Sequence, residues 1–177
     1  MNLKNIWIEL MSSLGMGENL SLCDEVLACY QEPHRHYHTL EHLRACVRYW
    51  RELASSLGEP SAQLLALFYH DAVYDVHRFD NEEASAELFR RHALVMGLAQ
   101  PLGDKVVAMI LATKTHEASD PDTQTVLDID LSILGESSDV FDQFERDIHA
   151  EYDWVAQEVF CRKRAQIYPE IFQRRPK

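Results

Sequence analysis

The sequence predicts an all-α protein that folds as a single domain. Apolar residues recur at spacings of three and four, and no alternating pattern typical of a strand persists. Gly and Pro fall between the periodic segments, and no repeat, low-complexity tract or linker divides the chain. A chain of 177 residues that is 46% hydrophobic can bury about 70% of its unfolded surface. We therefore expect one compact helical bundle over residues 1–177, with room for a shielded polar site.

The helices are predicted from their apolar stripes and their end signals. A stripe marks one face of 40–58, whereas 61–74 is apolar nearly all round, which is typical of a central helix. Pro33 stops the second helix, and Asp80 followed by Glu83 resembles an N-cap with its N3 acid. The predicted helices cover about residues 3–14, 20–30, 40–58, 61–74, 80–97, 101–115, 122–134, 138–152 and 154–172.

Composition excludes several classes of partner. The chain has 29 acidic and 17 basic residues, and its formal charge of -12 repels a nucleic-acid polymer. A small anion is not excluded, because one local cation can override the global field at short range. No stretch approaches the roughly 20 apolar residues of a membrane span, and the start MNLKNIWIEL shows no signal peptide. We expect a cytoplasmic protein whose cysteines, which form no CxxC pair, are reduced thiols: Cys23, Cys29, Cys46 and Cys161.

An imidazole and an acid lie side by side in the most apolar predicted helix, at His70 and Asp71. Burying them without partners would cost several kcal/mol. Three arrangements would satisfy them: a hydrogen-bonded pair in the core, a helix end that reaches solvent, or a ligand that both residues bind. The third arrangement is favoured by two further residues of ligand type. His42 lies beside the apolar stripe of the preceding helix, and Asp130 lies in the apolar "VLDIDLSILG". Two imidazoles and two carboxylates suit a divalent metal with open positions for water and substrate. Asp128 competes with Asp130, because residues two apart on a helix point about 200° apart.

The order of these residues resembles that of the HD superfamily of metal-dependent phosphohydrolases: a His, a His-Asp pair, and a distant Asp. His42, His70, Asp71 and Asp130 match it. "YHTLEHL" resembles the motif that opens cyclic-nucleotide phosphodiesterase sites, and "DLS" at Asp130 resembles the segment with their last metal ligand. With "FYHDAVYD" and "DNEEASA", the resemblance extends over roughly residues 30–170 to a small bacterial branch of predicted HD phosphohydrolases.

The resemblance implies a helical domain of the HD type. Its core would span about 30–135, with N-terminal helices over 3–30 and C-terminal helices over 138–172 packed on it. It also implies hydrolysis of a phosphomonoester or phosphodiester, in a nucleotide-like small molecule, by metal-activated water. The ligand set accepts Mn, Fe, Co, Ni, Zn or Mg. An alternative is a non-catalytic sensor module that binds a metal and a nucleotide. The apolar stripes of the terminal helices serve either the core or a homodimer interface.

His38 is the candidate general acid. It lies four residues before His42, so on one helical face its ring would lie beside the metal, and an imidazole can protonate a leaving alkoxide. Alternatively, His38 bonds a nearby carboxylate at the helix start.

Further polar residues gather around the expected site. After the His-Asp pair, Asp75 is a candidate for orienting the attacking water, and Asn81 and Glu82 are candidates for contacting substrate or a second metal ion. Arg35 can bind a substrate phosphate through its planar fork. Lys114 and His116 fall where an apolar helix ends, so they either contact phosphate at a pocket rim or cap that helix.

Overall fold

The structure is a computed structural model that describes residues 1–54 and 57–174. The described residues form helices and no strand, which confirms the all-α prediction. In chain order the elements are α1 (Leu3–Ser13), α2 (Leu20–Cys29), α3 (Leu40–Leu53), α4 (Pro60–Tyr69), α5 (Asn81–Met96), α6 (Gln100–Ala112), α7 (Pro121–Asp130), the 3-10 helix η2 (Leu131–Gly135), α8 (Ser138–Glu151) and α9 (Gln157–Arg174).

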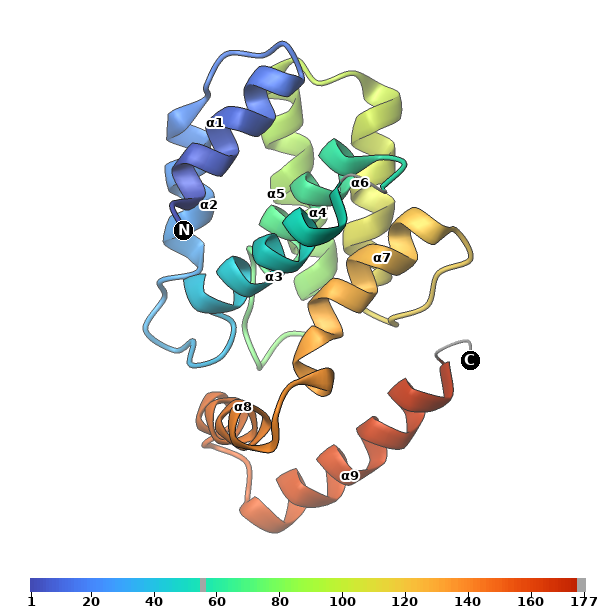
Figure 1. The fold of residues 1–177 in the computed structure, drawn as a ribbon. Helices are drawn as coiled ribbons and strands as arrows, with labels where there is room; N and C mark the ends of the chain where they lie inside the picture. The colour runs from blue at the N-terminus through green and yellow to red at the C-terminus, as the bar shows by residue number, and fades with distance from the viewer. Residues whose placement is uncertain (55–56, 175–177) are drawn as a thin grey trace.

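The core is built around α4. This helix packs against α1, α3, α5, α6 and α7, which surround it in Figure 1. Every residue from Ala62 to Tyr69 is buried, as its apolar composition predicts for a central helix. The rings of Phe68 and of Trp7 in α1 pack edge to face, with their centroids 5.4 Å apart. Because α4 is enclosed on all sides, its C-terminal end can carry polar groups into a shielded site.

The end of α4 differs from the prediction. The helix ends at Tyr69 rather than at residue 74, so His70 is its C-cap residue and Asp71 follows it. The Ala72 backbone N–H donates to the Tyr69 carbonyl at 3.0 Å and closes a turn. The apolar pattern continues through this turn, which explains the longer prediction. As a result, His70 and Asp71 lie at a helix end rather than in the middle of a buried helix.

Other boundaries also differ. The long helix predicted to reach Gly58 ends at Leu53, and residues 55 and 56 lie outside the described residues. The segment predicted as 122–134 divides at Leu131 into α7 and η2. Asp80 holds the N-cap position of α5, but its side chain makes no capping bond there. Its carboxylate instead accepts from the guanidinium of Arg78 at 2.9 and 3.0 Å.

The C-terminal helices lie on one side of the bundle. In Figure 1, α8 and α9 follow η2 and lie beyond the lower ends of α3 and α7. Phe144, Ile148 and Phe160 form their own apolar cluster, against which Tyr37 of the loop before α3 also packs. This cluster joins α8 and α9 to the segment that carries "YHTLEHL". No helix in the described part of the chain is long and apolar enough to cross a membrane.

Candidate metal centre

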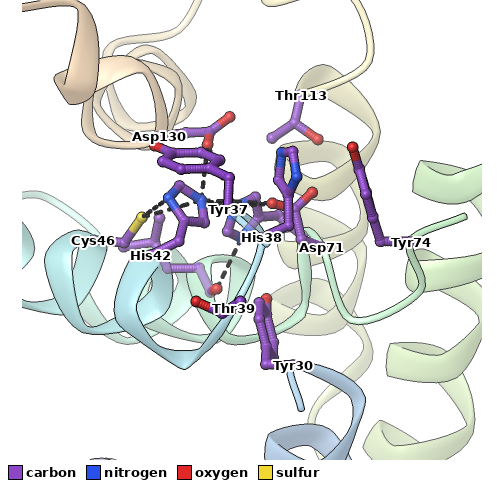
Figure 2. A network of polar contacts seen from close by, with 12 residues as sticks. Tyr30, Tyr37, His38, Thr39, His42, Cys46, Asp71, Tyr74, Thr113 and Asp130 are labelled. Carbon is purple, nitrogen blue, oxygen red and sulfur yellow. Dashed lines mark hydrogen bonds and ion pairs between the residues drawn. The ribbon is translucent and has the colours of Figure 1, made fainter. Parts of the chain in front are cut away.

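The four predicted ligands meet at one point, although they come from three helices. His42 lies in the first turn of α3, His70 and Asp71 lie at the end of α4, and Asp130 is the last residue of α7. One ligand atom from each lies within 4.8 Å of the others. Figure 2 shows the side chains of Asp130, His42 and Asp71 directed toward one another. The cluster can therefore bind a metal ion.

The spacing of the ligand atoms fits a single ion. The two imidazole Nε2 atoms are 3.1 Å apart. Asp71 Oδ2 lies 3.5 and 3.0 Å from the Nε2 atoms of His42 and His70, and Asp130 Oδ1 lies 3.3 and 3.4 Å from them. Atoms about 2.1 Å from a shared ion lie about 3.0 Å apart at octahedral angles and about 3.4 Å apart at tetrahedral angles. The donors thus need little rearrangement to surround one ion.

The electrostatics of the cluster favour a cation. Burial alone would raise the pKa of the Asp130 carboxyl, but His70 and the hydrogen bonds from His116 and His42 hold it well below its usual range. Burial likewise opposes ionisation of Asp71, yet His70 and His42 hold its pKa well below the usual range. Two ionised carboxylates in an enclosed site attract positive charge strongly. In the metal-free protein, Asp71, Tyr30 and Asp130 hold the pKa of His70 well above its usual range despite burial, so an imidazole proton supplies that charge, and a divalent ion would take its place.

Neighbouring groups orient these ligands. His70 Nδ1 donates to the Leu67 carbonyl at 2.9 Å, which leaves the lone pair of Nε2 for a metal. His116 Nε2 lies 3.3 Å from Asp130 Oδ2. The backbone of His116 has a φ of 53°, a left-handed conformation that is uncommon for a non-glycine residue and is frequent at functional sites. Cys46, which the sequence analysis treats only as a reduced thiol, also lies beside the ligands. Its Sγ is 3.7 Å from His42 Nε2.

The cluster borders a pocket of about 380 Å³. Asp71 and Asp130 line it, whereas His42 and His70 are almost fully enclosed. Aromatic and aliphatic side chains from η2, α8 and α9 also line the pocket, among them Ile133, Leu134, Phe144, Ile148 and Tyr168. The pocket therefore combines the carboxylates of the cluster with an apolar lining, a composition typical of small-molecule sites.

His38 lines the same pocket, in the turn before α3 rather than on the helix itself. Its ring centroid lies 5.9 Å from that of His42, so the predicted proximity exists. Nδ1 bonds Glu151 Oε2 at 2.7 Å, and the ring stacks on Tyr74 at 4.0 Å. Thus His38 lines the pocket and bonds a carboxylate, as the second alternative expects, and its role as general acid stays a prediction.

The acidic segment after α4 contributes only in part. Asp75 does not line the pocket, and its Oδ1 accepts from the His77 backbone N–H at 2.8 Å. We therefore reassign Asp75 from a catalytic to a turn-forming role. Asn81 lines the pocket, but its amide bonds the Asp75 backbone N–H and carbonyl at 3.1 and 2.9 Å. Glu82 also lines the pocket, with one oxygen 3.9 Å from Lys114 Nζ.

Lys114 and His116 lie at the pocket, as the sequence indicates. Lys114 Nζ donates to the Phe79 carbonyl at 2.7 Å and to Glu83 Oε1 at 2.5 Å. Glu83 thus pairs with this lysine instead of capping α5. A phosphate at this rim would have to compete with Glu83 for the ammonium group.

Arg35 does not line the pocket. Its side chain is fully buried. Nε and one terminal nitrogen bond Glu32 at 3.0 and 2.9 Å, and the remaining donors bond the carbonyls of His38, Asp71 and Ala72 at 3.2, 2.6 and 3.0 Å. All five N–H donors of the guanidinium are engaged. We therefore reassign Arg35 from phosphate binding to joining the loop before α3 to the turn after α4.

Replacing Arg35 with lysine should destabilise the fold. Lysine has three donors in place of five and lacks the planar fork, so at least two hydrogen bonds are lost. We expect the free energy of unfolding in urea to fall by about 2–3 kcal/mol. Arg48→Lys, at an arginine whose side chain is 58% exposed, is the matched control and should change it by less than about 0.5 kcal/mol. Unchanged stability of Arg35→Lys would contradict the structural role.

Glu151, the last residue of α8, is a site residue that the sequence analysis missed. It is buried, and its Oε1 accepts from the backbone N–H groups of His36, Tyr37 and His38 at 2.9, 2.8 and 3.0 Å. Its Oε2 accepts from the hydroxyl of Tyr74 at 2.9 Å in addition to the His38 ring. Despite burial, which raises the pKa, the hydrogen bond and charge of His38 and the backbone donors lower the pKa of Glu151 to about 2.

This lowered pKa predicts a pH dependence of stability. Since the pKa of Glu151 is lower in the folded chain than its ordinary value of 4.5, its contribution is complete above pH 4.5 and disappears as pH falls toward 2. The full contribution is about 3 kcal/mol. Between pH 6 and pH 3, the difference in unfolding free energy between wild type and Glu151→Gln should shrink by about 2 kcal/mol. Urea titrations of both proteins measure it, and a constant difference would contradict the assignment.

Comparisons of the chain with models of protein families, with curated proteins and with solved structures find no match. The geometry of the cluster and its pocket therefore carries the functional argument.

Proposed function

We propose that the protein is a metal-dependent phosphohydrolase of the HD type that cleaves a phosphomonoester or phosphodiester. The observation that carries the proposal is the convergence of His42, His70, Asp71 and Asp130 beside a pocket that His38 also lines. A divalent ion held by these four residues supplies an activated water molecule and shields the phosphoryl oxygens. The order of the motifs, which resembles that of HD phosphohydrolases, supports the same reaction.

The residues of the chain have separate roles in this proposal. His38 donates a proton to the oxygen that leaves phosphorus. His116 holds Asp130 in place through the contact at 3.3 Å. The apolar lining of the pocket, which includes Phe144 and Tyr168, packs against the alcohol part of the ester, which favours a nucleotide-like substrate over a bare polyphosphate.

A panel of phosphoesters tests the proposal. The protein is stripped with a chelator, reloaded with Mn²⁺, Mg²⁺ or Zn²⁺, and assayed with nucleoside monophosphates, cyclic nucleotides and sugar phosphates. We expect hydrolysis of at least one class that requires the added ion. Asp71→Ala, purified identically, should show none and so excludes a contaminating phosphatase. A metal-loaded wild type that hydrolyses no phosphoester would overturn the proposal and favour the sensor alternative.

A further inference from the structure

Glu151 makes five hydrogen bonds, four to the short segment 36–38 and one to Tyr74 after α4. Its two oxygens bond three successive backbone N–H groups, the ring of His38 and the hydroxyl of Tyr74. The side chain has no exposed surface. Since burying a carboxylate is costly, this set of donors has to satisfy it completely. The end of α8 is therefore fixed to the turn before α3.

The contact with His38 determines the state of its ring. An ionised carboxylate only accepts hydrogen bonds, so Nδ1 of His38, 2.7 Å from Oε2, must carry a hydrogen. In the neutral ring the other nitrogen, Nε2, then has the lone pair. When the ring gains a second proton, that proton resides on Nε2, the nitrogen that Glu151 does not bond. This arrangement suits a donor that faces the pocket.

The ring is also held in orientation. Tyr74 stacks on one face of His38 with ring centroids 4.0 Å apart and an angle of 29°. Tyr37 meets the ring edge to face at 5.0 Å. Figure 2 shows Tyr74 and Tyr37 close to His38 and the carboxylate of Asp71. Because the Tyr74 hydroxyl bonds the same Glu151 oxygen as His38 does, one carboxylate fixes both members of the stack.

A purely structural role for Glu151 explains only part of this arrangement. Joining α8 to the loop requires the three backbone contacts, which all go to Oε1. The second oxygen accepts instead from the imidazole of His38, which lines the pocket, and from the hydroxyl of Tyr74, which stacks on that imidazole. The contact with His38 is the one a positioning role requires.

We propose that Glu151 is a positioning residue for His38, which it holds as the Nδ1–H tautomer with Nε2 available to the substrate. The C-terminal helix α8 thereby completes the site. The proposal rests on the proposed function for its catalytic meaning, but the state of the ring is a property of the free protein. The positioning role of Glu151 and the proposed hydrolase activity can therefore fail independently.

Nitrogen-15 NMR of the histidine rings tests the tautomer without substrate. The His38 resonances are assigned by their loss in His38→Ala, and spectra are recorded at pH values where the ring is neutral. We expect wild type to show a protonated Nδ1 and an unprotonated Nε2. In Glu151→Gln we expect the ring to shift toward the Nε2–H form that free imidazoles favour. A wild-type ring in the Nε2–H form would overturn the proposal even if no variant folds.

Kinetics on a substrate from the phosphoester panel test the positioning role. Glu151→Gln should lower kcat by about tenfold or more, a share of the 10²–10⁴ that a positioned acid contributes, with little change in KM. In the His38→Ala background the same substitution should lower kcat no further, because Glu151 acts through His38. An equal loss in both backgrounds would show a structural effect alone and overturn the proposal. If no phosphoester is hydrolysed, the tautomer still decides it.

Discussion

Asp130→Ala should abolish metal binding, whereas Asp128→Ala should not. Both aspartates lie on α7, two residues apart, but only Asp130 joins the ligand cluster, and Asp128 is exposed. Mutating a residue that only hydrogen-bonds a metal ligand typically weakens metal affinity 10- to 100-fold. We therefore expect the loss of a direct ligand to weaken binding by more than about 100-fold. Elemental analysis after gel filtration should find about one equivalent in wild type and in Asp128→Ala, and almost none in Asp130→Ala.

Thermal unfolding provides a second measure of the same difference. An ion that binds only the folded chain stabilises it by about 2.7 kcal/mol at 100 times its Kd. Adding Mn²⁺ or Zn²⁺ to the stripped protein should therefore raise the Tm of wild type and Asp128→Ala but not that of Asp130→Ala. Circular dichroism should show that all three proteins retain their helices. Equal metal content in the two variants would show that Asp130 is not a ligand.

The fold class and the ligand cluster could be predicted because their signals are local. Spacings of three and four identify helices without any tertiary information. His70 and Asp71 stand out because polar groups interrupt a strongly apolar segment, where burial without a partner is costly, whereas only the resemblance of "DLS" favours Asp130 over Asp128. The end of α4 was not predictable by the same means, because the apolar Ala72, Val73 and Tyr74 continue the pattern through the turn.

Glu151 and Arg35 show why the rest of the site could not be predicted. Glu151 lies in an acidic segment, "FERDIHAEYDW", where one more carboxylate looks solvated. Its partners lie 77 to 115 residues away. Arg35 lies in a polar loop, so the sequence indicates a free cation and conceals its burial against backbone carbonyls. Both roles depend on tertiary contacts between distant segments, and no pattern of spacing records those.

Replacing His38 with alanine should lower turnover by 10²–10⁴-fold while leaving metal binding intact. This is the usual contribution of a general acid and corresponds to about 3–5 kcal/mol of transition-state stabilisation. His36→Ala is the matched control, because the side chain two residues earlier is exposed and its backbone N–H still bonds Glu151. We expect kcat of His36→Ala to stay within about twofold of wild type, a negligible change in barrier.

The leaving group separates proton donation from other roles of His38. An alkoxide needs a proton as it leaves phosphorus, whereas 4-nitrophenolate is stable without one. The loss in His38→Ala should thus be large for an alkyl phosphate and small for 4-nitrophenyl phosphate. Equal losses for both would show that His38 binds or orients substrate instead.

If wild type and His38→Ala bind metal and nucleotide equally well and neither turns over any ester, the pocket serves ligand sensing. The contrast between the two leaving groups therefore decides whether His38 performs chemistry on the substrate.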